Sequence, residues 1–229
     1  MAETGEASLR PNIADGFDVD PSALKKSDRY KLLCGLIVPR PIALVTTLTG
    51  TGVVNAAPFS FFNVFSEEPP LIVLGVNARA DGSVKDTTRN ISDRKEFVVH
   101  LVTEDIAEAM NVCAIDFPHE MSEVQMAGMT LVPSRTVAPP AIAEAPVALE
   151  CRLSQLIPIS PVRNLVLGEI VRIRAREGVI EPERLHVDTR AYRPIGRLAG
   201  NQYAKQGDVF ELRRGTYVEW LKERGEEPA

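Results

Sequence analysis

The chain has 229 residues, 45% of them hydrophobic, which is enough for one substantial core or for one core with a subdomain. Its formal net charge of −5 and isoelectric point of about 5.4 argue against a general nucleic-acid-binding protein. No apolar run approaches the ~20 residues that a membrane span needs, and the acidic, polar residues 1–16 do not resemble a secretion signal.

Cysteines and histidines are few and widely separated. Cys34, Cys113 and Cys151 are odd in number and lie in apolar or helical surroundings, which is typical of buried thiols in a reducing compartment. His100, inside a predicted strand, is expected to be a hydrogen-bonded core residue or a ligand-facing one. His119 is expected to be a solvated loop residue, with acid–base chemistry as the alternative. We therefore expect a cytoplasmic protein with no metal site, no membrane association and no nucleic-acid partner.

The first part of the chain leads into a β-hairpin. Residues 1–34 are expected to form an arm and a short helix that begins near Pro21. The prolines at positions 39 and 41 exclude a helix, and residues 42–48 are rich in strand-forming side chains. Residues 49–52, with the sequence TGTG, predict the hairpin turn that follows this strand.

Residues 55–66, with the sequence NAAPFSFFNVFS, combine hydroxyl, amide and small side chains with four phenylalanines. A plain core strand would not need so many polar side chains, and a plain loop would not carry so many phenylalanines. The combination suits a wall that is apolar towards a core and hydrogen-bonding towards a flat, polar-edged ligand. The alternative is a phenylalanine-rich core strand with polar edges.

A second polar cluster lies at a predicted helix start. Ser83 and Asp86 have the spacing of a capping box that opens a helix running to about residue 94. Free N–H groups at a helix start attract anions, and Ser83, Lys85 and Thr87 add hydroxyls and a cation. The pattern fits a phosphate-binding site, and it also fits an ordinary capped surface helix.

The other strands are predicted at residues 70–76, 97–102, 147–156 and 164–174. The first of these is continuously apolar, which predicts a central strand buried on both faces, and the last alternates from residue 168 onward. Helices are expected at residues 104–114, 122–128 and 216–224, with an extended surface crossing at 133–146. Strong strands with few, short helices predict a mainly β fold, a β-barrel with helical decorations.

Several short motifs follow one another along the chain: PRPIA at 39–43, NAAPFSFFN at 55–63, paired prolines at 69–70, KDTTRNI at 85–91, FVV at 97–99, LGE at 167–169 and RLAGNQY at 197–203. In this order and spacing they resemble the flavin reductase-like family of FMN-binding split β-barrels, in its flavoredoxin-like branch. The resemblance covers roughly residues 35–205 as the split-barrel domain. It leaves residues 1–34 as an N-terminal arm with a short helix and residues 206–229 as a C-terminal extension with a short helix.

The resemblance implies a homodimer with one FMN per subunit, bound near the subunit interface. It implies that the flavin ring lies along the segment containing Asn55, Ala57, Pro58, Phe59, Ser60 and Phe61. It implies that the phosphate is held by Ser83, Lys85, Asp86 and Thr87. The segment with Asn201 and Tyr203 is implied to approach the flavin or its substrate side, in the same subunit or across the dimer.

The implied activity is that of an NAD(P)H-dependent flavin reductase. NADH or NADPH would pass a hydride to N5 of FMN, and the electrons would go on to a small-molecule substrate or to a flavin-dependent partner oxygenase. The alternatives are a flavoredoxin-like electron carrier and an FMN enzyme that acts on a small organic substrate. No catalytic acid or base is assigned, because the cofactor performs the redox chemistry and backbone N–H groups can stabilise its reduced ring.

Overall fold

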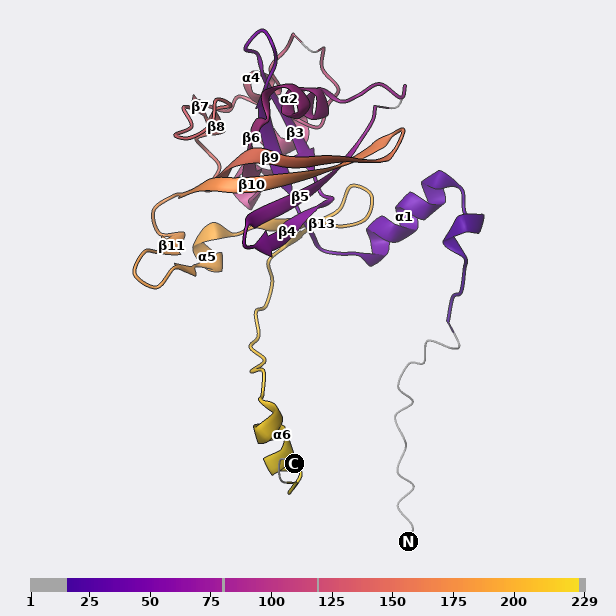
Figure 1. The fold of residues 1–229 in the computed structure, drawn as a ribbon, viewed down its shortest axis with the longest axis vertical. Coiled ribbons are helices and arrows are strands. Elements are labelled where there is room, and N and C mark those ends of the chain that lie inside the picture. Colours follow the sequence, from indigo (N-terminus) through magenta and orange to yellow (C-terminus); the bar gives the residue numbers. More distant parts are fainter. Residues whose placement is uncertain (1–15, 80, 119, 227–229) are drawn as a thin grey trace.

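The computed structural model describes residues 16–79, 81–118 and 120–226 (Figure 1). Its main body is a seven-stranded antiparallel sheet with the strand order β3-β2-β6-β9-β10-β5-β4. The strands are β2 (Ala43–Leu48), β3 (Val54–Phe59), β4 (Phe62–Glu67), β5 (Pro70–Asn77), β6 (Glu96–Leu101), β9 (Val147–Ser160) and β10 (Arg163–Ala175). The predicted mainly β fold is therefore confirmed.

The two outermost strands of this sheet, β3 and β4, are consecutive in sequence and are joined by Ser60 and Phe61 alone. The short connection draws both sheet edges together into a barrel. Shorter strands complete the fold. They form a sheet of β1 (Arg40–Pro41), β13 (Ile195–Arg197) and β14 (Tyr203–Lys205), and the pairs β7 (Leu131–Val132) with β8 (Ala141–Ile142) and β11 (Ile180–Glu181) with β12 (His186–Val187).

Strand β2 separates two hydrophobic cores. Because successive strand residues point to opposite faces, Ala43 and Val45 enter the barrel interior while Leu44 enters a second core. The second core lies against the helices α3 (Ala107–Val112) and α4 (Glu123–Met126). Burial on both faces agrees with the sequence of β2, in which Thr46 and Thr47 are buried together with the apolar side chains.

Strand β5 is buried on one face only, so the prediction of burial on both faces is wrong. Ile72, Leu74 and Val76 point into the barrel core, whereas Leu71 and Val73 are half-buried. The helices of the barrel pack over β2, β3 and β9, on the other half of the sheet. Within the described chain, no helix packs extensively against β5.

The helices are short, as predicted, but several boundaries differ. A 3₁₀ turn (Pro21–Ala23) precedes α1 (Lys26–Leu36), and the helix predicted at 104–114 divides into a 3₁₀ turn (Glu104–Ile106) and α3. The predicted surface crossing at 133–146 carries β8 and buries Val137 and Ile142, so it is partly core. In β10 an irregularity between Ile170 and Arg172 interrupts the predicted alternation and leaves Ile173 exposed.

The C-terminal segment leaves the barrel and ends in α6 (Tyr217–Glu223), which lies well away from the sheet (Figure 1). The predicted closing helix is confirmed. It begins with a capping box in which the side chains of Thr216 and Glu219 satisfy each other's backbone N–H groups. The segment that connects it to β14 exposes Val209, Phe210 and Leu212.

Candidate functional site

Helix α2 (Asp86–Arg94) begins close to the predicted phosphate site, but the predicted capping box is wrong. Lys85 is the N-cap residue, and no side chain among the described residues caps the helix. The Ser83 hydroxyl instead donates to Asp81 Oδ1 at 2.7 Å, because the two residues form a tight local turn. The first N–H groups of α2 are therefore left without a side-chain acceptor, which keeps the helix start available to an anion.

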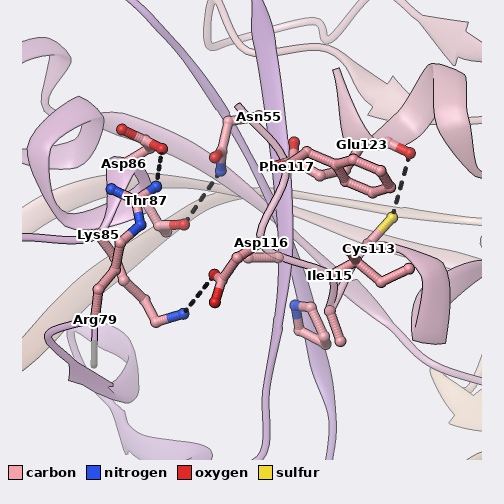
Figure 2. Close-up of a pocket in the computed structure, with 13 residues that line it drawn as sticks. Asn55, Arg79, Lys85, Asp86, Thr87, Cys113, Ile115, Asp116, Phe117 and Glu123 are labelled. Atoms are coloured by element: carbon pink, nitrogen blue, oxygen red, sulfur yellow. Dashed lines mark hydrogen bonds and ion pairs between the residues drawn. The ribbon is translucent and has the colours of Figure 1, made fainter. Parts of the chain in front are cut away.

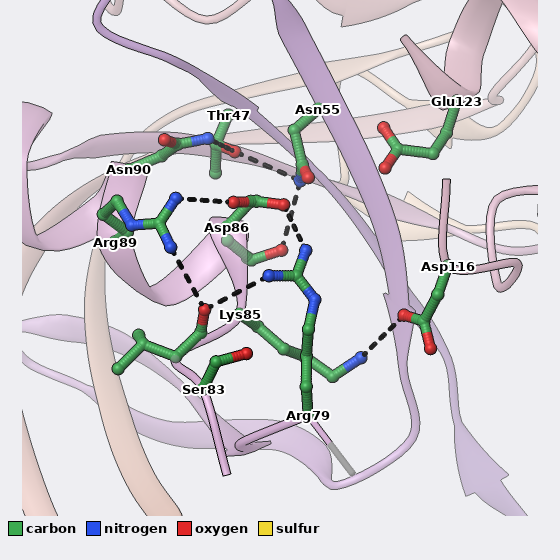
Figure 3. Close-up of polar contacts among 12 residues, drawn as sticks. Thr47, Asn55, Arg79, Ser83, Lys85, Asp86, Arg89, Asn90, Asp116 and Glu123 are labelled. Carbon is green, nitrogen blue, oxygen red and sulfur yellow. Dashed lines mark hydrogen bonds and ion pairs between the residues drawn. The ribbon is translucent and has the colours of Figure 1, made fainter. Parts of the chain in front are cut away.

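Asp86 at this helix start is buried and accepts hydrogen bonds from two arginines (Figure 3). Arg89 Nη1 donates to Oδ1 at 2.8 Å, and Arg79 donates to Oδ2. Two guanidinium groups thus offset the one carboxylate. Lys85 Nζ lies 3.9 Å from a carboxylate oxygen of Asp116, whose side chain is 77% exposed, so this ion pair contributes little. Lys85 is therefore a cation that an incoming anion can recruit.

A cavity of about 90 Å³ opens beside this helix start, and we call it the helix-start pocket (Figure 2). Strand β3 and the beginning of α2 supply one side of it. The loop at residues 113–117 and Glu123 of α4 supply the other side. Six predicted cofactor residues line this pocket: Asn55, Ala57, Pro58, Lys85, Asp86 and Thr87.

A second cavity of about 250 Å³, which we call the ring pocket, is lined by Pro58, Phe59, Ser60 and Phe61 from the bend between β3 and β4. The Tyr30 ring of α1 stacks on Phe61 with 6.2 Å between ring centroids. Asn77 and Arg163 also line the ring pocket. The ring pocket thus combines the aromatic side chains of Tyr30, Phe59 and Phe61 with polar and charged groups from Ser60, Asn77, Lys85 and Arg163.

The two pockets share Pro58 and Lys85, so together they form one elongated site. Every predicted cofactor residue lines one pocket or the other except Ser83, which lines neither. Phe59 is buried in the barrel core, whereas Phe61 faces the ring pocket. The bend thus packs Phe59 against the core and presents Ser60 and Phe61 to a cavity, and the binding of a flat ligand by this wall stays a prediction.

A buried hydrogen-bond network fixes β3 against α2 (Figure 3). The side-chain amide of Asn55 donates to Thr87 Oγ1 at 3.2 Å and to Thr47 Oγ1 at 3.4 Å. The Asn90 amide donates to the same Thr47 oxygen at 3.0 Å. Asn55 and Thr87 therefore position the two walls of the helix-start pocket relative to each other.

Glu123 fixes β3 from the opposite side of the same pocket. Its Oε2 accepts the backbone N–H of Ala56 at 2.9 Å, and burial of the side chain raises the pKa of this carboxyl group. The Cys113 thiol donates to the Glu123 carbonyl oxygen at 3.7 Å, and burial raises the pKa of Cys113 to about 12. Cys113 is therefore a structural thiol and not a nucleophile.

Asn201 and Tyr203 line neither pocket. They belong to the hairpin between β13 and β14, where the Tyr203 hydroxyl accepts a hydrogen bond from Arg197. Buried Arg40 connects this hairpin to the site. It donates to Leu198 O at 3.0 Å and to Ser60 Oγ at 3.5 Å. The hairpin thus adjoins the ring pocket without reaching into it within one chain.

The structure shows the environment of the three cysteines and of His100. All three cysteines are buried and free, as predicted, and His100 is a hydrogen-bonded core residue. His119 lies outside the described residues. Among the described residues there is no cluster of three or more potential metal ligands. No helix in the described ranges is long and apolar enough to cross a membrane.

Comparison with known protein families identifies the family of this chain. The "Flavin reductase like domain" family matches residues 35–196, which is most of the chain. The chain belongs to this family. Membership implies a flavin site. A curated protein of unassigned function from Halalkalibacterium halodurans is 45% identical over 86% of this chain and 96% of its own length.

Two solved structures are similar in both sequence and fold. Nitrilotriacetate monooxygenase component B from Bacillus cereus is 39% identical with a TM-score of 0.83, covering 86% of this chain and 98% of that one. The 2-nitrobenzoate 2-nitroreductase NbaA of Pseudomonas fluorescens is 42% identical with a TM-score of 0.82, covering 88% and 98%. A structure from Shewanella frigidimarina NCIMB 400, named for its split barrel domain, shares the fold alone, with 18% identity and a TM-score of 0.74 over 85% and 96%.

Sequence reasoning missed several residues that line the two pockets. Tyr30 comes from α1, Arg163 from the start of β10, and residues 113–117 from the loop after α3. These segments reach the site through tertiary packing, and nothing in their local sequence indicates it. Arg79 has a local signal, because it precedes the predicted phosphate motif by a few residues.

Proposed function

We propose that the chain is an FMN-binding oxidoreductase whose main activity is the reduction of FMN by NADH or NADPH. The observation that carries the proposal is the elongated site with two chemically different ends. One end has an uncapped helix start and Lys85, which suit a phosphate, and the other has an aromatic wall of flat side chains. FMN carries a phosphate at one end and a flat, polar-edged ring at the other.

The acidic side chains near the helix start do not oppose this assignment. Asp86 is paired with two arginines, Glu123 accepts a backbone N–H, and Asp116 is exposed. Lys85 and the N–H groups at the start of α2 therefore remain available to bind an anion. The Thr87 hydroxyl already accepts from Asn55, so it can still donate its own proton to a phosphate oxygen.

When bound, FMN supplies the ring that accepts the hydride, and the chain binds and orients it. Lys85 and the N–H groups at the start of α2 would hold the phosphate. The segment from Pro58 to Phe61 would flank the ring, and Phe59 anchors this wall in the barrel core. Arg40, which donates to Ser60 Oγ, orients the hydroxyl that faces the ring pocket.

Two similar structures suggest two routes for the electrons. Component B of a monooxygenase suggests that reduced flavin is delivered to a partner oxygenase. The nitroreductase neighbour favours a second candidate function, direct reduction of a small organic substrate by the bound FMN. We take delivery of reduced flavin as the first candidate, and the flavoredoxin-like carrier stays an alternative.

We also propose that the protein is a homodimer. Large apolar side chains are exposed on one end of α1 and on β4: Leu36, Ile37, Val64 and Phe65. Such side chains are expected to be covered by a partner surface. Both α1 and β4 adjoin the ring pocket, because Tyr30 lies on α1 and Phe61 immediately precedes β4. A second copy at this face would lie beside the flavin ring.

Anaerobic stopped-flow mixing of the FMN-loaded protein with NADH, and separately with NADPH, tests the activity. We expect rapid loss of oxidised-flavin absorbance with at least one of the two donors. Reoxidation by nitroaromatic carboxylates, compared with reoxidation by oxygen or free flavin, separates the first two candidates. Failure of both nicotinamides to reduce bound FMN would contradict the reductase proposal and favour the electron carrier.

A further inference from the structure

Arg163 is the first residue of β10 and is placed in the ring pocket by strand pairing. In the register of β10 with β5 it lies directly opposite Asn77, and both residues line the pocket. The Arg163 guanidinium carbon lies 4.9 Å from the centroid of the Phe61 ring. Phe61 is itself fixed by β5, because its carbonyl oxygen accepts the Gly75 N–H at 2.7 Å. The guanidinium therefore has a defined position at the rim of the ring pocket.

The charge of Arg163 is not balanced by any described residue. It makes no ion pair or hydrogen bond with another side chain in the ranges that the structure describes, and it is half-buried. None of the described residues that line the ring pocket is acidic. Arg79 and Arg89 at the helix start differ in this respect, because both are paired with Asp86. An unpaired cation in a partly enclosed pocket of a chain with net charge −5 indicates a site that receives negative charge.

A cation–π contact with Phe61 does not by itself account for this arrangement. Such a contact uses the face of the guanidinium and leaves its five N–H donors free. Half-burial removes part of the water that would otherwise solvate them. These free N–H groups can donate hydrogen bonds to an anionic or strongly accepting group that occupies the pocket.

We propose that Arg163 stabilises the negative charge that the flavin ring gains on reduction, and so favours the reduced cofactor over the oxidised one. The proposal rests on the proposed function, namely that FMN binds with its ring in the ring pocket. A hydride brings two electrons and one proton, so the neutral oxidised ring becomes a ring with one negative charge while the nicotinamide donor becomes a cation. The guanidinium of Arg163 can offset this charge without a proton transfer.

The matched variants are Arg163→Gln, Arg163→Lys and Arg152→Gln. Arg163→Gln removes the charge, and Arg163→Lys keeps it as a check that loss of structure is not responsible. Arg152→Gln removes the same charge from an exposed position on β9, where Arg152 lies 3.8 Å from Glu96 and outside both pockets. It therefore reports the general effect of one lost positive charge.

The measurement is a spectroscopic redox titration of bound FMN against a reference dye, together with the dissociation constant of oxidised FMN by calorimetry. For Arg163→Gln we expect the preference for reduced over oxidised FMN to fall about tenfold, which corresponds to about 30 mV for a two-electron couple. Oxidised FMN should bind with nearly unchanged affinity. Arg163→Lys should keep most of the wild-type potential, and Arg152→Gln should match wild type.

Two outcomes would overturn the proposal. The first is an unchanged potential in Arg163→Gln, and the second is an equal shift in Arg152→Gln, which would show a non-specific charge effect. Failure of the wild-type protein to bind FMN would instead contradict the proposed function itself. The two failures are therefore distinguishable.

Discussion

At the scale of single residues, His100 connects three strands through its imidazole ring. Its Nδ1 lies 2.9 Å from the Leu44 carbonyl oxygen of β2, and its Nε2 accepts the Ile142 N–H of β8 at 2.9 Å. These partners require a neutral ring with the proton on Nδ1. Complete burial lowers the pKa of His100 from 6.5 to about 4. The residue is thus a structural element of the barrel and not a catalytic base.

The depressed pKa of His100 predicts a loss of stability in acid. The stabilising contribution is complete above pH 6.5 and is lost as the pH falls through about 4, because the unfolded chain binds the proton first. The loss should be on the order of 2–3 kcal/mol. Urea unfolding of wild type and His100→Gln at pH 7 and pH 4.5 measures it. The variant should lose less stability on acidification, and an equal loss in both proteins would be inconsistent with the assignment.

At the scale of elements, β5 supports the ring pocket through a glycine. A Cβ atom at Gly75 would lie 3.1 Å from Cβ of Phe61, closer than side chains normally approach. The absence of a side chain at this position therefore lets Phe61 pack against the strand and shape the pocket wall.

Gly75→Ala should push Phe61 into the ring pocket and weaken the binding of FMN and riboflavin equally, by about 1–2 kcal/mol. Equal effects are expected because the change affects the ring and leaves the phosphate end intact. Gly50→Ala is the matched control, since no atom lies within 4 Å of a Cβ there. Calorimetric titration of both ligands checks this prediction. Unchanged flavin affinity in Gly75→Ala would show that Phe61 does not contact the ring.

The hairpin between β13 and β14 is the next element, and its role beside the flavin stays a prediction. We expect Asn201→Ala and Tyr203→Phe to keep FMN bound and to slow its reduction or to change the preferred acceptor. Stopped-flow reduction with each nicotinamide, normalised to bound FMN, is the measurement. Activity that falls only in proportion to bound FMN would mean that the hairpin supports the cofactor alone. Unchanged turnover would mean that it is a turn with no part in the substrate site.

Most elements could be predicted because their signals are local. Residues 42–48 and 97–102 carry strand-forming side chains, and residues 216–224 carry the helix with its cap. The start of α2 differs from the predicted capping box because Ser83 bonds to Asp81 and Asp86 bonds to two arginines, so neither side chain caps the helix. Tyr30 and Arg163 could not be found from sequence, since only the packing of α1 and the register of β10 with β5 bring them to Phe61.

At the scale of the whole molecule, the exposed apolar side chains of α1 and β4 predict a dimer. Light scattering of the flavin-loaded protein at micromolar concentration should give about twice the 25.1 kDa of one chain. Ile37→Glu, which adds a charge at a side chain that is 64% exposed, should shift the equilibrium towards monomer without unfolding the barrel. A particle of one chain's mass with flavin still bound would rule out the dimer.

The central claim is that the helix-start pocket binds the phosphate of FMN and the ring pocket binds its ring. The most direct test is the affinity of wild type, Lys85→Ala and Lys222→Ala for FMN and for riboflavin, by calorimetry. Lys222 lies on α6 and is the control for a lost surface charge. We predict that wild type prefers FMN to riboflavin. Lys85→Ala should weaken FMN alone, by about 1–3 kcal/mol, and Lys222→Ala should change neither affinity. Equal affinity of the wild-type protein for riboflavin and FMN would contradict the account.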